Sequence, residues 1–254
     1  MSFPGTFAPT LFASSSIFEN ELSTFFDGVN DRIEMQDTAS LNIANDLTMV
    51  CWVKTSGTTD ASFMSKYKTS GNHRQYLIGQ TAAGGLRVLI SRDGGSTNVK
   101  DYNSTETIND NNWHMVATTF ATNVLKLYID GVEITPNKVA DPVANQMPGG
   151  NISAFQMSSI EGVPTLFRYA GFLDECGIWA TQVLTSAEIL KLYNSGSPIN
   201  LLVNDGAYVS SGNLEAYYRM GDGDSSTTIF DAKSGSDGTL VSMDETSYVT
   251  EVPS

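Results

Sequence analysis

Residues 113–134 read WHMVATTFATNVLKLYIDGVEI, and this stretch decides the fold class. Residues 113–120 and 124–129 are runs of apolar, β-branched and aromatic residues of strand length. The pair Asp130-Gly131 separates the second run from a third at residues 132–134. An Asp-Gly pair between apolar runs is a strong hairpin signal, because both central residues of a type I′ turn need positive φ. The stretch therefore predicts consecutive antiparallel strands.

Similar strand signals recur along the rest of the chain. Residues 47–54 alternate with a period of two, and both sets of side chains are largely apolar, which is typical of a strand covered on both faces. Further strands are expected at residues 24–29, 32–35, 76–78, 86–90, 152–157, 169–179 and 214–220. Because helices do not alternate with these strands, a parallel α/β sheet is unfavourable.

One short helix is expected. Thr185 and Glu188 have the spacing of a capping box, and an apolar face follows them. Gly196 and Pro198 are expected to stop it. The fold prediction is thus all-β, a two-sheet antiparallel sandwich with one short helix.

The domain prediction is an N-terminal arm at residues 1–23 followed by a single sandwich at residues 24–254. Residues 213–254 are too few to bury a core alone, so residues 203–254 are expected to return to the same sandwich. The arm carries aromatic groups, among them Phe3, Phe7, Phe12 and Phe18, which an exposed tail would rarely hold. They are expected to pack on the chain's own domain or on a neighbouring subunit.

Charge and composition exclude several classes of protein. The net charge is −14, with 14 basic against 28 acidic residues, so no basic face for nucleic acid is expected. No apolar stretch is long enough to span a bilayer, and the first residues do not resemble a signal peptide. The expected place of synthesis is a cytoplasm.

Cys51 and Cys176 are two buried thiols or one disulfide, and the sequence leaves both open.

Several motifs resemble one family. Residues 25–34 (FFDGVNDRIE) resemble the opening strand pair of laminin-G-like, concanavalin A-like lectin/glucanase domains, and residues 47–54 look like their strand ending in Trp-Val. Residues 112–117, 127–131 and 171–175 match further motifs in the expected order. Residues 214–224, followed by Gly238-Thr239-Leu240, are similar to a segment common in such proteins from bacteriophages. The resemblance implies a jelly-roll sandwich over about residues 24–200.

The resemblance also implies functions. The leading hypothesis is a non-enzymatic phage virion protein, a capsid decoration or a tail or fibre component made in the host cytoplasm, with glycan adhesion as a further role. Its partners would be other virion proteins, copies of itself in a homo-oligomer, and surface glycans, without membrane insertion. The alternative is a cellular, calcium-dependent carbohydrate-binding or adhesion module, followed by a glycan hydrolase or lyase. Family members often hold calcium near the first and last strands, and Asp27 and Asp174 are the matching positions; otherwise Asp27 would serve its turn.

No catalytic residue is expected from the sequence. Glucanases of this fold place carboxylates at alternate positions of one strand, whereas Asp174 and Glu175 are adjacent and are expected to point to opposite faces. His114 is expected to be a structural imidazole. For sugar stacking, the candidate aromatic residues are Tyr67, Tyr76, Tyr102 and Trp179, although residues of this type belong to the core more often than to a sugar platform.

Overall fold

The computed structural model describes residues 18–143, 147–148, 151–163 and 165–254. In this part of the chain, one antiparallel sheet holds eight strands. Its path runs through β10 (Val132–Ile134), β9 (Val124–Ile129), β8 (Trp113–Ala121), β3 (Leu47–Lys54), β13 (Ala170–Ala180), β1 (Ser23–Asp27) and β17 (Tyr248–Val249), and β14 (Leu214–Tyr218) also pairs with β13.

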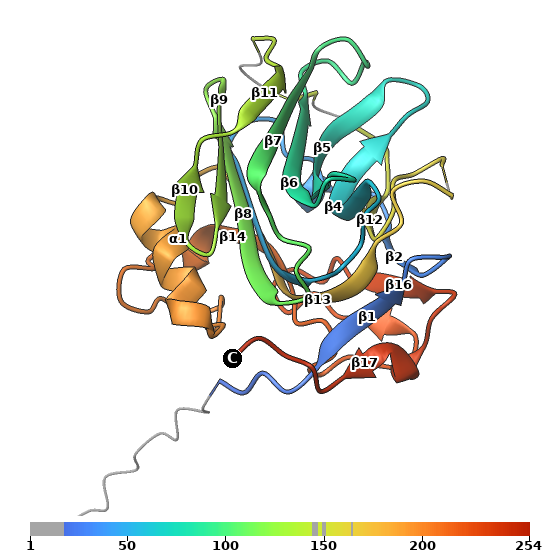
Figure 1. Ribbon diagram of the computed structural model, residues 1–254, viewed down its shortest axis with the longest axis vertical. Helices are drawn as coiled ribbons and strands as arrows, with labels where there is room; N and C mark the ends of the chain where they lie inside the picture. Colours follow the sequence, from blue (N-terminus) through green and yellow to red (C-terminus); the bar gives the residue numbers. More distant parts are fainter. Residues whose placement is uncertain (1–17, 144–146, 149–150, 164) are drawn as a thin grey trace, which may run out of the picture.

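A second antiparallel sheet holds nine of the described strands. Their order is β11 (Asn137–Ala140), β7 (Val99–Thr107), β6 (Gly85–Ser91), β5 (His73–Gln80), β4 (Ala61–Lys68), β12 (Phe155–Met157), β2 (Arg32–Met35), β16 (Gly238–Val241) and β15 (Thr228–Ile229). The two sheets pack as layers of one sandwich (Figure 1). The predicted all-β, two-sheet antiparallel jelly-roll architecture is confirmed.

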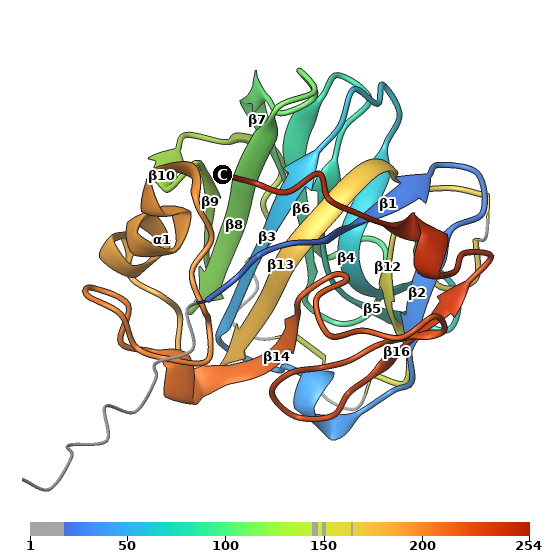
Figure 2. The ribbon, with the colours of Figure 1, turned by 90° about the horizontal axis from the view of Figure 1, so that it is seen from below.

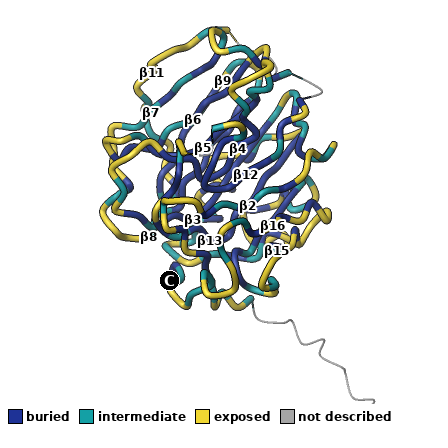
Figure 3. The backbone as a smooth tube through the Cα atoms, turned by 90° about the vertical axis from the view of Figure 1, so that its right-hand side faces the viewer, coloured by how far each residue is buried: buried dark blue, intermediate teal, exposed yellow. Residues whose placement is uncertain are grey.

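The main core lies between the sheets. Alternate residues of β3, Met49, Cys51 and Val53, are fully buried there, as the period of two requires. From the other sheet come Phe63, Ile78 and Val88, which are also fully buried. Figure 3 shows buried backbone along the strands and exposed backbone mainly in the connections between them.

The hairpin signal is confirmed at β9 and β10. Ile129 pairs with Val132, and the two residues between them have positive φ, 51° at Asp130 and 78° at Gly131. Both central turn residues are therefore in the left-handed region that the Asp-Gly pair predicts.

The expected helix is α1 (Ser186–Tyr193). Its capping box is complete, because the Thr185 side chain accepts a hydrogen bond from the Glu188 amide while the Glu188 carboxylate accepts one from the Thr185 amide. The helix ends earlier than predicted, at Asn194, which takes a left-handed φ of 45° and so makes Gly196 unnecessary as the stop. Among the described residues, no helix is long and apolar enough to cross a membrane.

Two further layers cover the outer faces of the sandwich. Helix α1 and residues 197–213 cover the eight-stranded sheet, and Trp179, Ile189 and Tyr208 form a second apolar cluster there. Residues 158–163 and 165–168 lie over the nine-stranded sheet, where Ile160 packs against Tyr67. Strands are therefore buried on both sides over much of each sheet.

The C-terminal strands belong to both sheets. β14 pairs with β13, β17 with β1, and β16 with β2. Figure 2 shows β14 beside β13, β16 beside β2 and the last residues of the chain beside β1. The residues after position 203 thus add strands to the same sandwich.

Cys51 on β3 and Cys176 on β13 are both buried and free. Their strands are neighbours in the eight-stranded sheet. The structure therefore has two buried thiols, one of the two arrangements that the sequence left open.

Candidate functional site

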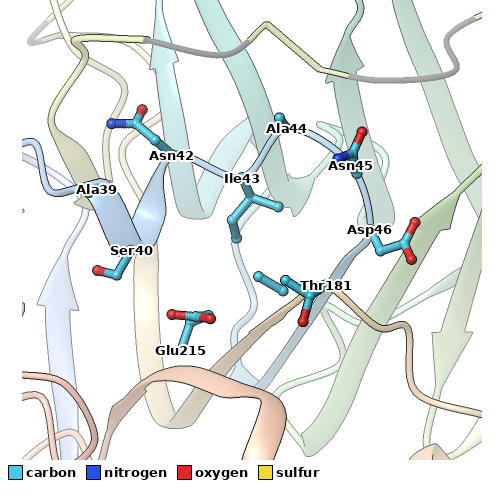
Figure 4. Close-up of a pocket in the computed structure, with 10 residues that line it drawn as sticks. Ala39, Ser40, Asn42, Ile43, Ala44, Asn45, Asp46, Thr181 and Glu215 are labelled. Carbon is cyan, nitrogen blue, oxygen red and sulfur yellow. The ribbon is translucent and has the colours of Figure 1, made fainter.

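A polar pocket opens at one end of the sandwich, with a volume of about 300 Å³. Three segments line it: the loop between β2 and β3, the residues that follow β13, and the start of β14 (Figure 4). The polar side chains around it belong to Ser40, Asn42, Asn45, Asp46, Thr181 and Glu215.

Strand register explains why these distant residues meet. Leu47 at the start of β3 pairs with Ala180 at the end of β13, so Asp46 and Thr181 stand side by side just beyond the sheet. Trp179 pairs with Leu214, which brings Glu215 to the same end. Pairing of three strands thus assembles one site from residues far apart in the chain.

Two hydrogen bonds from side chains of β5 fix the loop that forms the pocket wall. The Tyr76 hydroxyl donates to the Leu41 carbonyl at 2.9 Å, and the Gln75 amide donates to the Ile43 carbonyl at 2.6 Å. Leu41 and Ile43 are themselves buried in the core. Asn42 between them is therefore displayed from a rigid support, which suits a binding site.

Most polar side chains of the pocket lack a partner within the described chain. Asn45, Asp46, Thr181 and Glu215 make no side-chain hydrogen bond or ion pair to any described residue. The Asn42 side-chain oxygen is buried and also lacks a partner among the described residues. Polar groups left open in a concave site are free to bond a ligand, and the two acidic side chains give the site negative charge.

The four aromatic residues proposed as sugar platforms are buried, which contradicts an exposed stacking role. Tyr76 and Trp179 are 0% exposed, Tyr102 is 2% and Tyr67 is 8% exposed. Outer layers cover two of them: Ile160 and its neighbours cover Tyr67, while α1 and residues 197–213 cover Trp179. Tyr76 and Tyr102 belong to the core between the sheets. Tyr76 instead supports the pocket loop through its hydroxyl.

The structure does not bring the two proposed calcium ligands together. Asp27 pairs with Ala170, four residues before Asp174 on β13. The Asp27 carboxylate accepts hydrogen bonds from the Val29 and Asn30 amides, which is the turn role considered above. Within the described ranges, no group of three or more His, Cys, Asp or Glu residues could hold a metal ion.

Asp174 and Glu175 do not point to opposite faces as expected. Glu175 has a φ of 44°, and the register with β3 shifts between Asp174 and Gly177, so a β-bulge lies there. Both side chains lie on the outer side of the eight-stranded sheet, away from the core between the sheets. The Tyr217 hydroxyl donates to Glu175, the Arg219 guanidinium is 3.2 Å from it, and the Asn20 amide donates to Asp174 at 2.8 Å.

Asp174 and Glu175 are both buried, and the pKa of each is raised. Burial raises the pKa of Asp174 well above its usual range, and the charge of Glu175 raises it further. Burial raises the pKa of Glu175 to about 7, against the opposing effect of Arg219. With exposures of 0% and 2%, the pair does not reach a substrate from solvent.

His114 is a satisfied imidazole, as predicted. Its ring nitrogens lie 2.8 Å from an Asp130 oxygen and 3.1 Å from an Asp110 oxygen. The hydrogen bond to Asp130 raises its pKa. The ring is thereby tied into the surface of β8 and its neighbouring turns.

Of the arm residues proposed for partner binding, Phe3, Phe7 and Phe12 lie outside the described residues. Phe18 is half-buried on its own chain, with the Arg219 guanidinium 4.7 Å from its ring centre. The described end of the arm is therefore packed on its own sandwich.

Comparison with known proteins supports the fold assignment. The family model described as the concanavalin A-like lectin/glucanases superfamily matches residues 27–190. No curated protein shows significant sequence similarity to the chain.

Solved structures share the fold at low sequence identity. A Bacteroides ovatus protein described as a candidate carbohydrate-binding protein has 17% identity and a TM-score of 0.66, covering 93% of this chain, which spans 62% of that protein's length. The CBM40 domain of a Ruminococcus gnavus sialidase, also solved with α2,3-sialyllactose, has 14% identity and a TM-score of 0.52, covering 68% of this chain and 97% of its own. Domain 4 of a Geobacillus stearothermophilus arabinanase, solved with arabinotriose, has 20% identity and a TM-score of 0.50, with 67% and 76% covered.

Proposed function

The chain belongs to the concanavalin A-like lectin/glucanases superfamily, and from that premise we propose that it is a non-enzymatic carbohydrate-binding or adhesion module. The supporting observation is the pocket at the end of the sandwich, where Asn45, Asp46, Thr181 and Glu215 present polar side chains without partners in the described chain. Sugar hydroxyls both donate and accept hydrogen bonds, which matches this mixture of carboxylate, amide and hydroxyl groups.

The charge of the pocket selects among glycans. Asp46 and Glu215 lack a cationic partner within the described chain, so each carboxylate is open to hydroxyl donors. A carboxylated or sulfated sugar would bring like charge against both. The preferred ligand is therefore a neutral glycan. Because no aromatic residue lines the pocket among those described, binding relies on hydrogen bonds and is expected to be weak at a single site.

The absence of catalysis is part of the proposal. The adjacent acids Asp174 and Glu175 are buried beneath Asn20 and beside Tyr217, so they are not offered to a glycosidic bond. Release of reducing sugar by the purified chain, abolished by Glu215→Gln, would instead identify the pocket as the active site of a hydrolase.

Replacing Glu215 by glutamine should weaken binding of the best neutral glycan about tenfold, because a hydrogen bond to a charged acceptor contributes about 1–1.5 kcal/mol more than one to the neutral amide. A glycan array identifies the ligand, and calorimetry compares the affinities of wild type, Glu215→Gln and Asp46→Asn. Glu106→Gln, which removes the same charge from an exposed position on β7, should bind like wild type.

Two outcomes would contradict this assignment. Equal affinity of wild type and Glu215→Gln would move the glycan site away from the pocket. Preference for a sialylated or sulfated glycan would contradict the neutral ligand class. Binding lost on addition of a chelator and restored by calcium would instead favour the calcium-dependent alternative.

A place on a phage particle is a separate proposal. Its support is the similarity of residues 214–240 to a segment common in phage proteins of this family. The protein should then co-sediment with purified particles as a capsid decoration or a tail or fibre part, in contact with copies of itself and other virion proteins. Its absence from particles made by cells that express it would refute the virion role and leave glycan binding untouched.

A further inference from the structure

A second polar pocket, of about 310 Å³, lies on the outer face of the eight-stranded sheet where α1 begins. Strands β8 and β9 line one side of it with Thr119, Lys126 and Tyr128, and residues 183–186 line the other side. It shares no lining residue with the pocket at the end of the sandwich. We call it the α1 pocket.

Strand register places a hydroxyl and an ammonium group side by side in the α1 pocket. Thr119 on β8 pairs with Lys126 on β9, and both point away from the core because their neighbours Phe120 and Leu125 are buried in it. The Lys126 ammonium group lies 2.9 Å from Glu133, and these side chains are 40% and 42% exposed. Such an exposed ion pair contributes little, so the ammonium group can bind a further acceptor.

The Thr119 hydroxyl is open toward the pocket. Thr119 is only 4% exposed, yet its hydroxyl has no hydrogen-bond partner among the described residues. The threonines beside it are satisfied, because Thr118 donates to the Lys126 carbonyl at 2.9 Å and Thr48 accepts from the Leu184 amide at 3.0 Å. A buried hydroxyl without a partner is unfavourable, which indicates that a ligand in the pocket bonds to Thr119.

The start of α1 adds further donors. The first amides of a helix have no acceptor within it, and the Thr185 hydroxyl accepts only from the Glu188 amide. The Ser186 and Ala187 amides therefore stay open at the end of the helix that carries partial positive charge. The Ser186 hydroxyl, 3.4 Å from that of Tyr128, lies in the same pocket.

The charge of the α1 pocket selects an anion. No carboxylate lines it among the described residues, although acidic residues outnumber basic ones 28 to 14 in the chain. Its ammonium, amide and hydroxyl groups all donate hydrogen bonds, which is the combination that binds phosphate at helix N-termini. We propose that the α1 pocket binds a phosphate group through Lys126, Thr119 and the first amides of α1.

Nuclear magnetic resonance of the full chain tests the proposal. Inorganic phosphate, added at constant ionic strength, should shift the Ser186 and Ala187 amide resonances along saturating curves. Thr119→Val replaces the hydroxyl by a methyl group and should weaken phosphate binding about tenfold, the usual effect of one hydrogen bond to a charged group. Thr119→Ser restores a hydroxyl and should recover most of the affinity.

Two control variants make the test specific. Thr105→Val removes an exposed hydroxyl on β7 and should bind phosphate like wild type. Glu215→Gln should also leave phosphate binding unchanged, so the phosphate and glycan proposals fail separately. Near-ultraviolet circular dichroism verifies that each variant is folded. Lys126→Met, at a partly exposed position, should weaken binding about threefold and does not depend on the folding of Thr119→Val.

Methyl phosphate identifies the source of the phosphate group. Tighter binding of methyl phosphate than of inorganic phosphate assigns the pocket to a phosphate monoester, and the reverse order assigns it to the free ion. The proposal is overturned if the Ser186 and Ala187 amides do not respond to phosphate, or if Thr119→Val and Thr105→Val bind phosphate equally.

Discussion

Replacing Trp179 by alanine should lower the free energy of unfolding by about 3–5 kcal/mol, the usual cost of removing a fully buried large aromatic side chain. Trp179 is 0% exposed, and its ring packs edge-on against Tyr208 with 6.2 Å between ring centres. Its indole nitrogen donates to the Tyr208 hydroxyl at 3.2 Å, and that hydroxyl donates to the Leu201 carbonyl at 2.8 Å. The substitution leaves a cavity under the segment that covers the eight-stranded sheet. Urea unfolding followed by circular dichroism measures the loss.

Trp179→Phe is the matched control, since it keeps one buried aromatic ring and removes the five-membered part of the indole with its nitrogen. A loss of about 1–2 kcal/mol is expected for it. If Trp179→Ala is as stable as wild type but no longer binds glycan, the burial argument is wrong and Trp179 is a sugar platform.

Local signals in the sequence were enough for much of the sandwich. The alternation in residues 47–54 predicts β3, and Asp130-Gly131 predicts the turn between β9 and β10, because each signal depends on neighbours along the chain. The capping box of Thr185 and Glu188 predicts the start of α1 for the same reason.

Strands whose burial depends on distant partners were missed. β4 contains Lys66, which breaks its apolar pattern yet is fully buried, because its ammonium group donates to Asp37 at 2.8 Å and to the Ser153 carbonyl. The second half of β7 is exposed and polar, and β15 and β17 are two residues each. Such strands are specified by pairing, which local periodicity does not contain.

The candidate site was missed for a related reason. Asn42, Asn45 and Asp46 give an ordinary loop composition, and nothing in the sequence connects them with Thr181 and Glu215. Only the register of β3 against β13, and of β13 against β14, brings these residues to one pocket. Aromatic residues were favoured instead because their sequence signal is the same in a core and on a platform.

The sequence also does not predict the bulge at Glu175, and this bulge has a consequence for stability. Adjacent residues on a regular strand face opposite ways, but the left-handed conformation of Glu175 turns both Asp174 and Glu175 outward into one buried site. Both carboxyl groups are buried, and Arg219 pairs with that of Glu175. Their protonated forms are favoured in the folded chain.

Stability should consequently fall as the pH rises from 5 to 8. The folded chain holds a proton on Glu175 up to a pKa of about 7, whereas the unfolded chain loses it near 4.5. The stabilisation is therefore complete below about pH 4.5 and is lost as the pH rises through 7, which amounts to about 3 kcal/mol for this group. Asp174 changes in the same direction, as does Asp224, whose pKa burial raises to about 6. Urea midpoints measured at pH 5, 6, 7 and 8 give the slope.

Glu175→Gln should flatten this dependence. The amide keeps a hydrogen-bonding group beside Tyr217 and Arg219 but carries no charge, which also removes the repulsion that raises the pKa of Asp174. The variant should lose less stability than wild type between pH 5 and 8, while Glu106→Gln at its exposed position should keep the wild-type slope. His114 contributes a residual decrease above its ordinary pKa of 6.5 in every variant, because Asp130 stabilises its charged form. If wild type and Glu175→Gln have the same slope of stability against pH, burial does not raise the pKa of Glu175 in the folded chain.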